Sequence, residues 1–234
     1  MKHIRLIIIA LFTFSLAANA QEVKKMEASA KDYIELLKVK GYDAYPVDIS
    51  CLNDSSYMLE FEIKEYIGGE DKEVSSRYIG RSPNRRMVKD FMWRKLSDEE
   101  MKGIKKEACD FENGVFSRAE KITVGFMPSE VDSLRQGRII VENMTAFNLK
   151  IEQKPITNTK DNETMYAYHI RPFKPSKFEV GKFIPMVFYC SFWYDSDYNI
   201  FRCCGEREID PDMTSEILKR TPHYYVIGFT ATKQ

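Results

Sequence analysis

The sequence has few of the residues, and none of the motifs, that mark common catalytic sites. It contains three histidines and five cysteines. The Gly-x-Ser-x-Gly and Ser-x-x-Lys motifs of serine nucleophiles do not occur, and neither does the Cys-x-x-Cys motif of redox enzymes. The histidines and cysteines also lack the close spacing of a zinc site. No motif in the sequence therefore indicates enzymatic activity, and no cofactor is expected.

The sequence also has no excess of positive or negative charge. The chain has 35 basic and 35 acidic residues. A near-neutral protein has no global electrostatic reason to bind nucleic acid or an anionic membrane, so we expect neither as a partner. Hydrophobic residues make up 44% of the chain and charged residues 30%, which indicates a folded protein rather than a disordered one.

Only the N-terminus carries a long apolar run. Residues 6–16 are apolar, follow a short basic start and are too few to cross a bilayer, which needs about 20 residues. A small-x-small pattern then places the expected cleavage between Ala20 and Gln21. We therefore predict that residues 1–20 are a signal peptide rather than a buried helix. The mature chain, 21–234, is expected to be periplasmic or secreted, with no lipid anchor and no membrane span.

The leader ends Ala18-Asn19-Ala20-Gln21, and the chain ends in a run that reads Thr221-Pro-His-Tyr-Tyr-Val-Ile-Gly-Phe229. Both segments resemble uncharacterised exported proteins of Bacteroidetes-type bacteria. The resemblance implies export and no particular activity. The tripeptide Asp132-Ser133-Leu134 also looks like the short O-glycosylation signal of such bacteria.

Alternating apolar and polar residues dominate the chain and predict strands. In segment 57–67, Leu59, Phe61 and Ile63 share one face while charged residues occupy the other. We predict one α+β domain over 21–234, mainly antiparallel, for which a sandwich is one arrangement. The predicted strands are 57–67, 74–79, 121–127, 138–143, 145–152, 165–170, 183–194, 198–209 and 223–230.

Helical spacing is confined to a few segments. Residues 24–40 predict an N-terminal helix that ends near Gly41. Residues 83–108 predict a helical insertion, with Pro83 at the first helical position and a capping box that starts at Ser97. Shorter helical pieces are expected at 128–136 and 211–220.

A local basic cluster at residues 81–95 surrounds Trp93. Its cations include Arg85, Arg86 and Lys89. Together with the indole, they would suit a sulfated or carboxylated glycan, or an acidic protein partner. The alternative is a solvated helix face without a binding role.

The segments 183–194 and 198–209 are expected to pair as a hairpin. With Asp195 opposite Tyr198, Cys190 would face Cys203 within disulfide reach. The alternative is two buried thiols that act as small hydrophobic groups. Export permits a disulfide.

The same hairpin carries two further sets of candidate site residues. Its aromatic side chains are candidates for ligand contact or for core packing, and its acidic turn matches four positions of an EF-hand loop. Ile200 stands where that loop needs glycine, so an ordinary hairpin turn is the alternative to calcium. The aromatic candidates are Trp193, Tyr194 and Tyr198, and the metal candidates are Asp195, Asp197, Asn199 and Glu206.

Three classes of function remain after these exclusions. Our leading hypothesis is a non-catalytic exported protein that binds a protein or a glycan. The second is a hydrolase whose site is assembled from distant residues, which would show as a pocket with a strongly shifted carboxyl or histidine pKa. The third is a structural component of the cell envelope.

Overall fold

The computed structural model describes residues 27–68, 73–91, 96–158 and 163–234. The chain divides into two compact units, 1–36 and 37–234. The predicted signal peptide and its cleavage site, Ala20 and Gln21, lie outside the described residues.

The predicted N-terminal helix is present as α2 (Ala30–Val39), which begins later than Lys24. Its C-terminus has the geometry of a Schellman motif. Gly41 adopts a φ of 82°, its amide donates to the Lys38 carbonyl at 2.8 Å, and the Tyr42 amide donates to the Leu37 carbonyl at 3.0 Å. Because a side chain at Gly41 would be strained at this φ, the glycine fixes where the helix ends.

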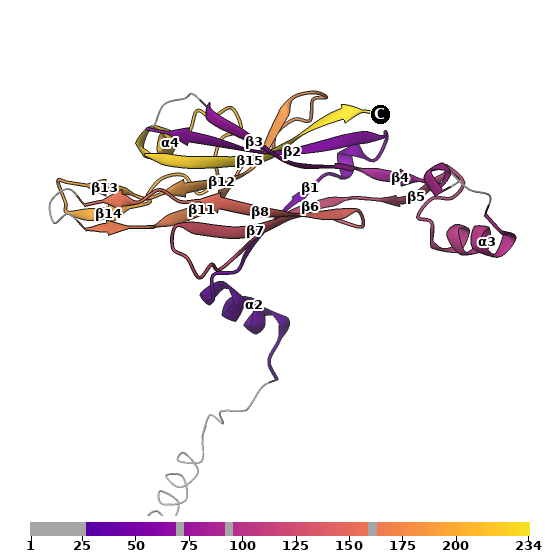
Figure 1. Ribbon diagram of the computed structural model, residues 1–234, viewed down its shortest axis with the longest axis horizontal. Coiled ribbons are helices and arrows are strands. Elements are labelled where there is room, and N and C mark those ends of the chain that lie inside the picture. The colour runs from indigo at the N-terminus through magenta and orange to yellow at the C-terminus, as the bar shows by residue number, and fades with distance from the viewer. Residues whose placement is uncertain (1–26, 69–72, 92–95, 159–162) are drawn as a thin grey trace, which may run out of the picture. The chain divides into compact units, whose positions relative to one another are not determined.

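Two antiparallel sheets face one another in residues 37–234 (Figure 1). The first sheet has the order β1-β6-β7-β8, and the second has the order β11-β12-β15-β2-β3. The first contains β1 (Asp43–Asp48), β6 (Lys121–Met127), β7 (Leu134–Val141) and β8 (Thr145–Glu152). The second contains β11 (Tyr168–Pro172), β12 (Phe183–Ser191), β15 (His223–Lys233), β2 (Tyr57–Ile67) and β3 (Glu73–Pro83).

The main hydrophobic core lies between these sheets and takes side chains from both. Phe61 of β2, which is fully buried, contacts Phe147 of β8 with ring centroids 5.6 Å apart. The alternating residues of β6 and β8 supply the first sheet's share, with Ile122, Val124 and Leu149 buried. The predicted α+β class with mainly antiparallel strands is therefore confirmed, and the two sheets form a sandwich.

Strand β15 is buried on both faces because a second core covers the outer side of its sheet. Tyr225 and Ile227 point into the main core, while Tyr224 and Val226 join the second core with α4 (Glu216–Arg220). A strand that is buried on both faces has apolar residues at successive positions, which explains the continuous apolar run in β15.

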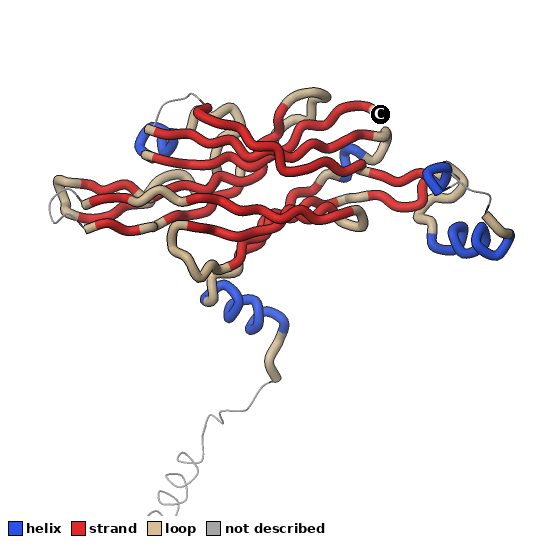
Figure 2. The backbone as a smooth tube through the Cα atoms, in the orientation of Figure 1, coloured by secondary structure: helices blue, strands red, loops and turns tan. Residues whose placement is uncertain are grey.

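The predicted helical insertion at 83–108 is correct only in its second half (Figure 2). Helix α3 (Asp98–Glu107) begins with the expected capping box, in which Ser97 and Glu100 cap one another. Before it, the chain completes β3, forms β4 (Arg85–Met87) against β5 (Val115–Arg118), and makes the 3-10 helix η2 (Val88–Phe91).

Asn84 gives the physical reason for this correction. Its side chain is fully buried, accepts from the Tyr57 amide at 2.8 Å and donates to the carbonyls of Leu52 and Ser55 at 2.7 and 3.0 Å. These tertiary bonds hold the chain extended where its spacing indicated a helix. Leu52 belongs to a second 3-10 helix, η1 (Ser50–Leu52).

Three further segments differ from expectation. Residues 128–133 are loop rather than a helical turn, and β7 already begins at Leu134. The predicted loop at 155–163 contains β9 (Ile156–Thr157), which pairs with β10 (Thr164–Met165). The predicted short helix 211–220 is helical only over α4.

Candidate functional site

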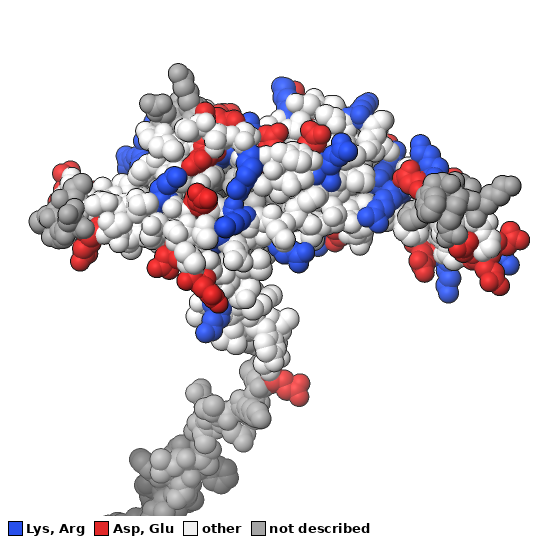
Figure 3. All heavy atoms as spheres, viewed as in Figure 1, with Lys and Arg blue, Asp and Glu red and all other residues white. Residues whose placement is uncertain are grey.

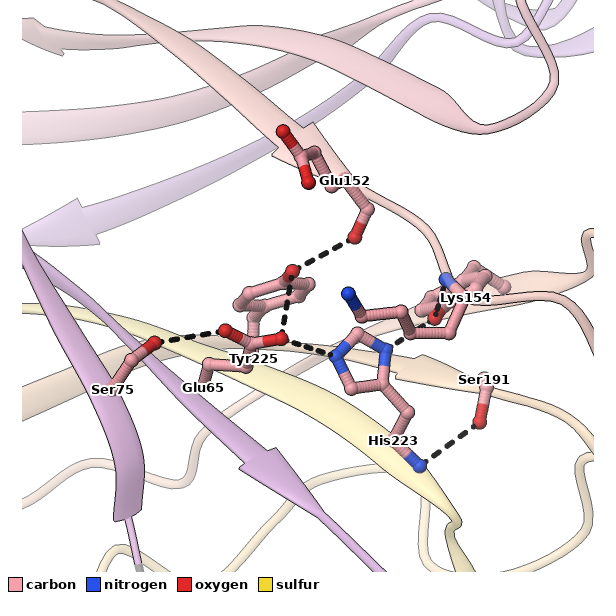
Figure 4. Close-up of polar contacts among 8 residues, drawn as sticks. Glu65, Ser75, Glu152, Lys154, Ser191, His223 and Tyr225 are labelled. Carbon is pink, nitrogen blue, oxygen red and sulfur yellow. Dashed lines mark hydrogen bonds and ion pairs between the residues drawn. The ribbon is translucent and has the colours of Figure 1, made fainter.

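A network of polar side chains links the two sheets where β8 ends (Figure 4). His223 of β15 is its centre and is 3% exposed. Its Nε2 lies 3.0 Å from Oε1 of Glu65 on β2, and its Nδ1 bonds the hydroxyl of Tyr168 on β11. Ser75 donates to the second oxygen of Glu65 at 2.8 Å. The Tyr168 hydroxyl also accepts from the backbone amide of Lys154 at 2.8 Å.

The environment sets the protonation states of this network. Burial lowers the pKa of His223, against the opposing effect of the Glu65 hydrogen bond. Burial alone would raise the pKa of Glu65, but bonds from Ser75 and His223 outweigh it and lower that pKa. Burial raises the pKa of Tyr168. The network is therefore a carboxylate, a neutral imidazole that donates from Nε2, and a protonated phenol.

The members of this network are bonded to one another and to the chain that follows β8. Both ring nitrogens of His223 and both oxygens of Glu65 are engaged. Through Tyr168 and the Lys154 amide, these bonds connect the second sheet to the end of β8 in the first. We therefore interpret the network as a structural bridge between the sheets. Sequence patterns missed it because Glu65 and His223 are 158 residues apart.

Beside the network lies a groove of about 700 Å³, which we call the tryptophan groove. It brings together Trp193 and Tyr194, two of the residues predicted to contact a ligand. Both are half-buried in β13 (Trp193–Asp195), which pairs with β14 (Ile200–Arg202). The remaining lining residues are Ile67, Lys154, Pro155, Ile156, Thr157, Ser191, Ser196, Arg220, Pro222 and His223.

The charge of the tryptophan groove has one sign. Lys154 and Arg220 are its cations, and none of the described residues that line it is acidic. By contrast, Figure 3 shows basic and acidic side chains interspersed over the visible face of the molecule. Lys154 also interacts with Glu65, whereas Arg220 makes no ion pair within the described chain.

A second pocket, of about 430 Å³, lies between the edge strands β1 and β11, and we call it the tyrosine cleft. Behind it, three rings stack in series: Phe126 on Tyr189 at 5.5 Å, and Tyr189 on Tyr168 at 4.9 Å. The lining residues are Asp43, Tyr45, Ser129, Val131, Asp132, Leu134, Arg135, Gln153, Tyr166, Tyr168, His169, Ile170 and Tyr189.

The other predicted contact residues lie elsewhere. Tyr198 is 70% exposed and its ring lies 4.6 Å from the Arg202 guanidinium, outside the tryptophan groove. In the basic cluster, Arg85 donates to the Ser56 hydroxyl and Arg86 to the Met144 carbonyl, so both support local structure. The other two members are Lys89, which lies in η2, and Trp93, which falls outside the described residues.

The predicted hairpin register is wrong by two residues. Asp195 pairs with Ile200 rather than with Tyr198, so Cys190 does not face Cys203. Cys190 pairs with His169 and Tyr224 of the neighbouring strands instead, and all five cysteines are free thiols. Burial raises the pKa of Cys190 to about 12, which makes it unreactive.

The expected strand 198–209 ends early because a buried arginine holds the chain after it. Arg171 is 5% exposed and donates to the carbonyls of Cys203, Gly205 and Glu206. These bonds take segment 203–206 out of β14. The backbone carbonyls thereby replace a carboxylate as partners of a buried guanidinium.

The structure does not assemble the four metal candidates. Asp195 accepts from the backbone amides of its own turn and pairs with Arg202 at 2.7 Å. Asn199 accepts from the Tyr194 hydroxyl, and Glu206 accepts from the Glu216 amide at the start of α4. Asp197 also lies in this turn. No group of three or more His, Cys, Asp or Glu side chains in the described ranges could hold a metal ion.

A family described as a domain of unknown function, DUF5041, matches residues 12–233. The chain belongs to this family. Comparison with curated proteins found no match, and comparison with solved structures found none. Within the part of the chain that the structure describes, no helix is both long and apolar enough to cross a membrane.

Proposed function

We propose that this DUF5041 protein is an exported, non-catalytic binding protein of the Bacteroidetes type, and that it binds an acidic glycan in the tryptophan groove. One observation carries the proposal. The groove combines an indole and a phenol with two cations and no acidic lining residue in the described chain. The leader supports export, although it lies outside the described residues.

The chemistry of the lining favours a ligand that has both an apolar face and an anionic group. Trp193 and Tyr194 supply flat apolar surface with a polar edge. Arg220 supplies planar donors that match a carboxylate or a sulfate. Hydroxyl groups, among them those of Thr157 and Ser196, can bond to sugar hydroxyls. An acidic oligosaccharide offers all three kinds of partner.

The polar network argues against the rival hydrolase. The pKa values of His223 and Glu65 are both lowered, and His223 lines the groove. Their shifts, however, stabilise a neutral imidazole and a carboxylate that bind to one another. The rings and cations of the groove supply contacts for recognition, so recognition without turnover is the better-supported function.

The test is calorimetric titration of the mature protein with uronic-acid and sulfated oligosaccharides and with their neutral counterparts. We expect saturable binding of an acidic oligosaccharide that weakens as salt is raised, because exposed charges are screened. Arg220→Gln should lower the affinity at least about tenfold, since a charged hydrogen bond contributes about 1.5–3 kcal/mol. Trp193→Ala should lower it at least as much.

Tyr198→Ala is the matched control, because Tyr198 is an exposed aromatic of the same hairpin outside the groove. It should bind like the wild type. Arg220 is exposed, so its variant keeps the test valid even if Trp193→Ala unfolds. Equal binding of acidic and neutral oligosaccharides, or full binding by Arg220→Gln, would refute the proposal. Release of shorter products during the titration would favour a hydrolase.

A further inference from the structure

The tyrosine cleft lies at the side of the sandwich where the sheets part. Strands β1 and β11 are the edge strands there, and each pairs with a neighbour on one side only. On the opposite side β3 and β8 are joined directly, because Arg77 of β3 donates to the Lys150 carbonyl of β8 and Phe147 packs against the backbone at Gly80. The lining of the tyrosine cleft is largely polar, whereas a neighbouring pocket of about 450 Å³ beside Val47 and Phe178 is largely apolar.

Several hydrogen-bonding groups in this cleft have unused capacity. The Tyr189 hydroxyl accepts from the Gln153 amide at 2.5 Å, which leaves its own proton to donate. The Tyr45 hydroxyl has no hydrogen bond within the described ranges. Arg135 uses one terminal nitrogen for the Gly41 carbonyl at 2.6 Å and for Asp43 at 3.7 Å. Its other terminal nitrogen makes no bond to any described residue.

The charges of the cleft are nearly balanced, which separates it from the tryptophan groove. Arg135 lies beside Asp43, and Asp132 adds a second, exposed carboxylate. Burial lowers the pKa of His169, so its imidazole is neutral at neutral pH. The two carboxylates would repel an anionic ligand, and the guanidinium would repel a cationic one. A neutral ligand is repelled by neither.

The phenols of the cleft are fixed donors. Burial raises the pKa of Tyr45 to about 12, and it raises that of Tyr189 as well, so both hydroxyls stay protonated over the physiological range. Stacking between Phe126 and Tyr168 holds the Tyr189 ring, and Gln153 fixes its hydroxyl. A site held in this way loses little conformational entropy when a ligand binds.

From these observations we propose that the tyrosine cleft is a second binding site, separate from the tryptophan groove, and that it takes a neutral sugar unit. A sugar's hydroxyl groups both donate and accept. They can therefore bond to the phenols and the guanidinium as acceptors, and to Asp43 and Asp132 as donors. The cleft volume of about 430 Å³ falls within the range of small-molecule sites.

The experiment is nuclear magnetic resonance titration of the 15N-labelled mature protein with neutral xylo-, gluco-, galacto- and manno-oligosaccharides. The corresponding uronic acids and free amino acids are titrated in parallel. At least one neutral sugar should shift the amide signals of Gln153, His169 and Tyr189 in a saturable way. The uronic acid of the same configuration should bind at least threefold more weakly.

Two conservative variants locate the site. Tyr45→Phe keeps the ring and removes one unpaired hydroxyl, and it should weaken neutral-sugar binding about threefold to tenfold. Asp43→Asn should weaken it to a similar degree. Tyr78→Phe, which removes a hydroxyl from an exposed tyrosine on β3, is the matched control and should leave the affinity unchanged.

The outcomes separate this site from the tryptophan groove. Arg220→Gln should not change neutral-sugar binding, so the proposal stands even if no acidic glycan binds the groove. It is overturned if none of the neutral sugars shifts the cleft signals, or if Tyr45→Phe and Asp43→Asn both bind like the wild type. It is also overturned if the uronic acids or the amino acids bind more tightly than the neutral sugars.

Discussion

Replacement of Tyr168 by phenylalanine tests whether the polar network is a structural bridge. The change removes one hydroxyl and keeps the ring, which stacks on Tyr189 with centroids 4.9 Å apart. It leaves Nδ1 of the buried His223 without its partner, whereas the backbone amide of the exposed Lys154 can bond to water instead. A buried unpaired group costs about 1–3 kcal/mol. We therefore expect the free energy of unfolding to fall by about 1–3 kcal/mol.

The assay is urea and thermal unfolding followed by tryptophan fluorescence and circular dichroism. For a chain of this size the expected loss corresponds to a melting temperature lower by roughly 2–12 °C. Tyr78→Phe is the control: Tyr78 is 57% exposed, so its variant should change stability by less than about 0.5 kcal/mol. A Tyr168→Phe variant as stable as the wild type would refute a structural role, and it would reopen the case for a catalytic one.

Three further predictions concern the fold. Asn84→Ala leaves two buried backbone groups and one part-buried carbonyl unpaired, and it should cost about 3–5 kcal/mol in chemical unfolding. The control, Asn148→Ala on the exposed face of β8, should cost less than about 0.5 kcal/mol. Gly80→Ala would place a Cβ 2.4 Å from the Phe147 ring and should cost about 1–3 kcal/mol, measured in the same way. His223 has a folded pKa below its ordinary 6.5, so the stability it contributes is present above pH 6.5 and is lost as the pH falls through the folded pKa. His223→Gln should therefore flatten the dependence of melting temperature on pH below 6.5, and an unchanged profile would contradict the buried neutral imidazole.

Strands with one buried face were predicted well from the sequence. Segments 57–67, 121–127 and 145–152 match β2, β6 and β8 at both ends. The apolar residues of each alternating pattern face the core, and the pattern stops where the strand ends. The pattern therefore predicts both ends of the strand. The capping box at Ser97 was equally reliable, because its bonds are local.

Predictions failed where distant residues decide the local structure. Asn84 holds segment 83–87 extended through bonds to Leu52 and Tyr57, which no local pattern contains. Arg171 ends the second arm of the predicted hairpin in the same way.

The candidate site shows the same division. Trp193 and Tyr194 were singled out as aromatic residues of a predicted hairpin, and the structure places both in the lining of one groove. The groove's cations, Lys154 and Arg220, come from separate parts of the chain, so no spacing in the sequence joins them. The network around His223 forms because β11, β12, β15, β2 and β3 lie side by side in this order. The sequence alone does not predict that order.

The most direct measurement of the proposed function uses Trp193 as its own reporter. The chain has two tryptophans, so a Trp93→Phe variant leaves Trp193 as the sole source of indole fluorescence. Titration with an acidic oligosaccharide should shift this emission in a saturable way, with an affinity that falls as salt is raised. An emission that does not respond to any acidic oligosaccharide, or that responds equally to neutral ones, would contradict binding of an acidic glycan in the tryptophan groove.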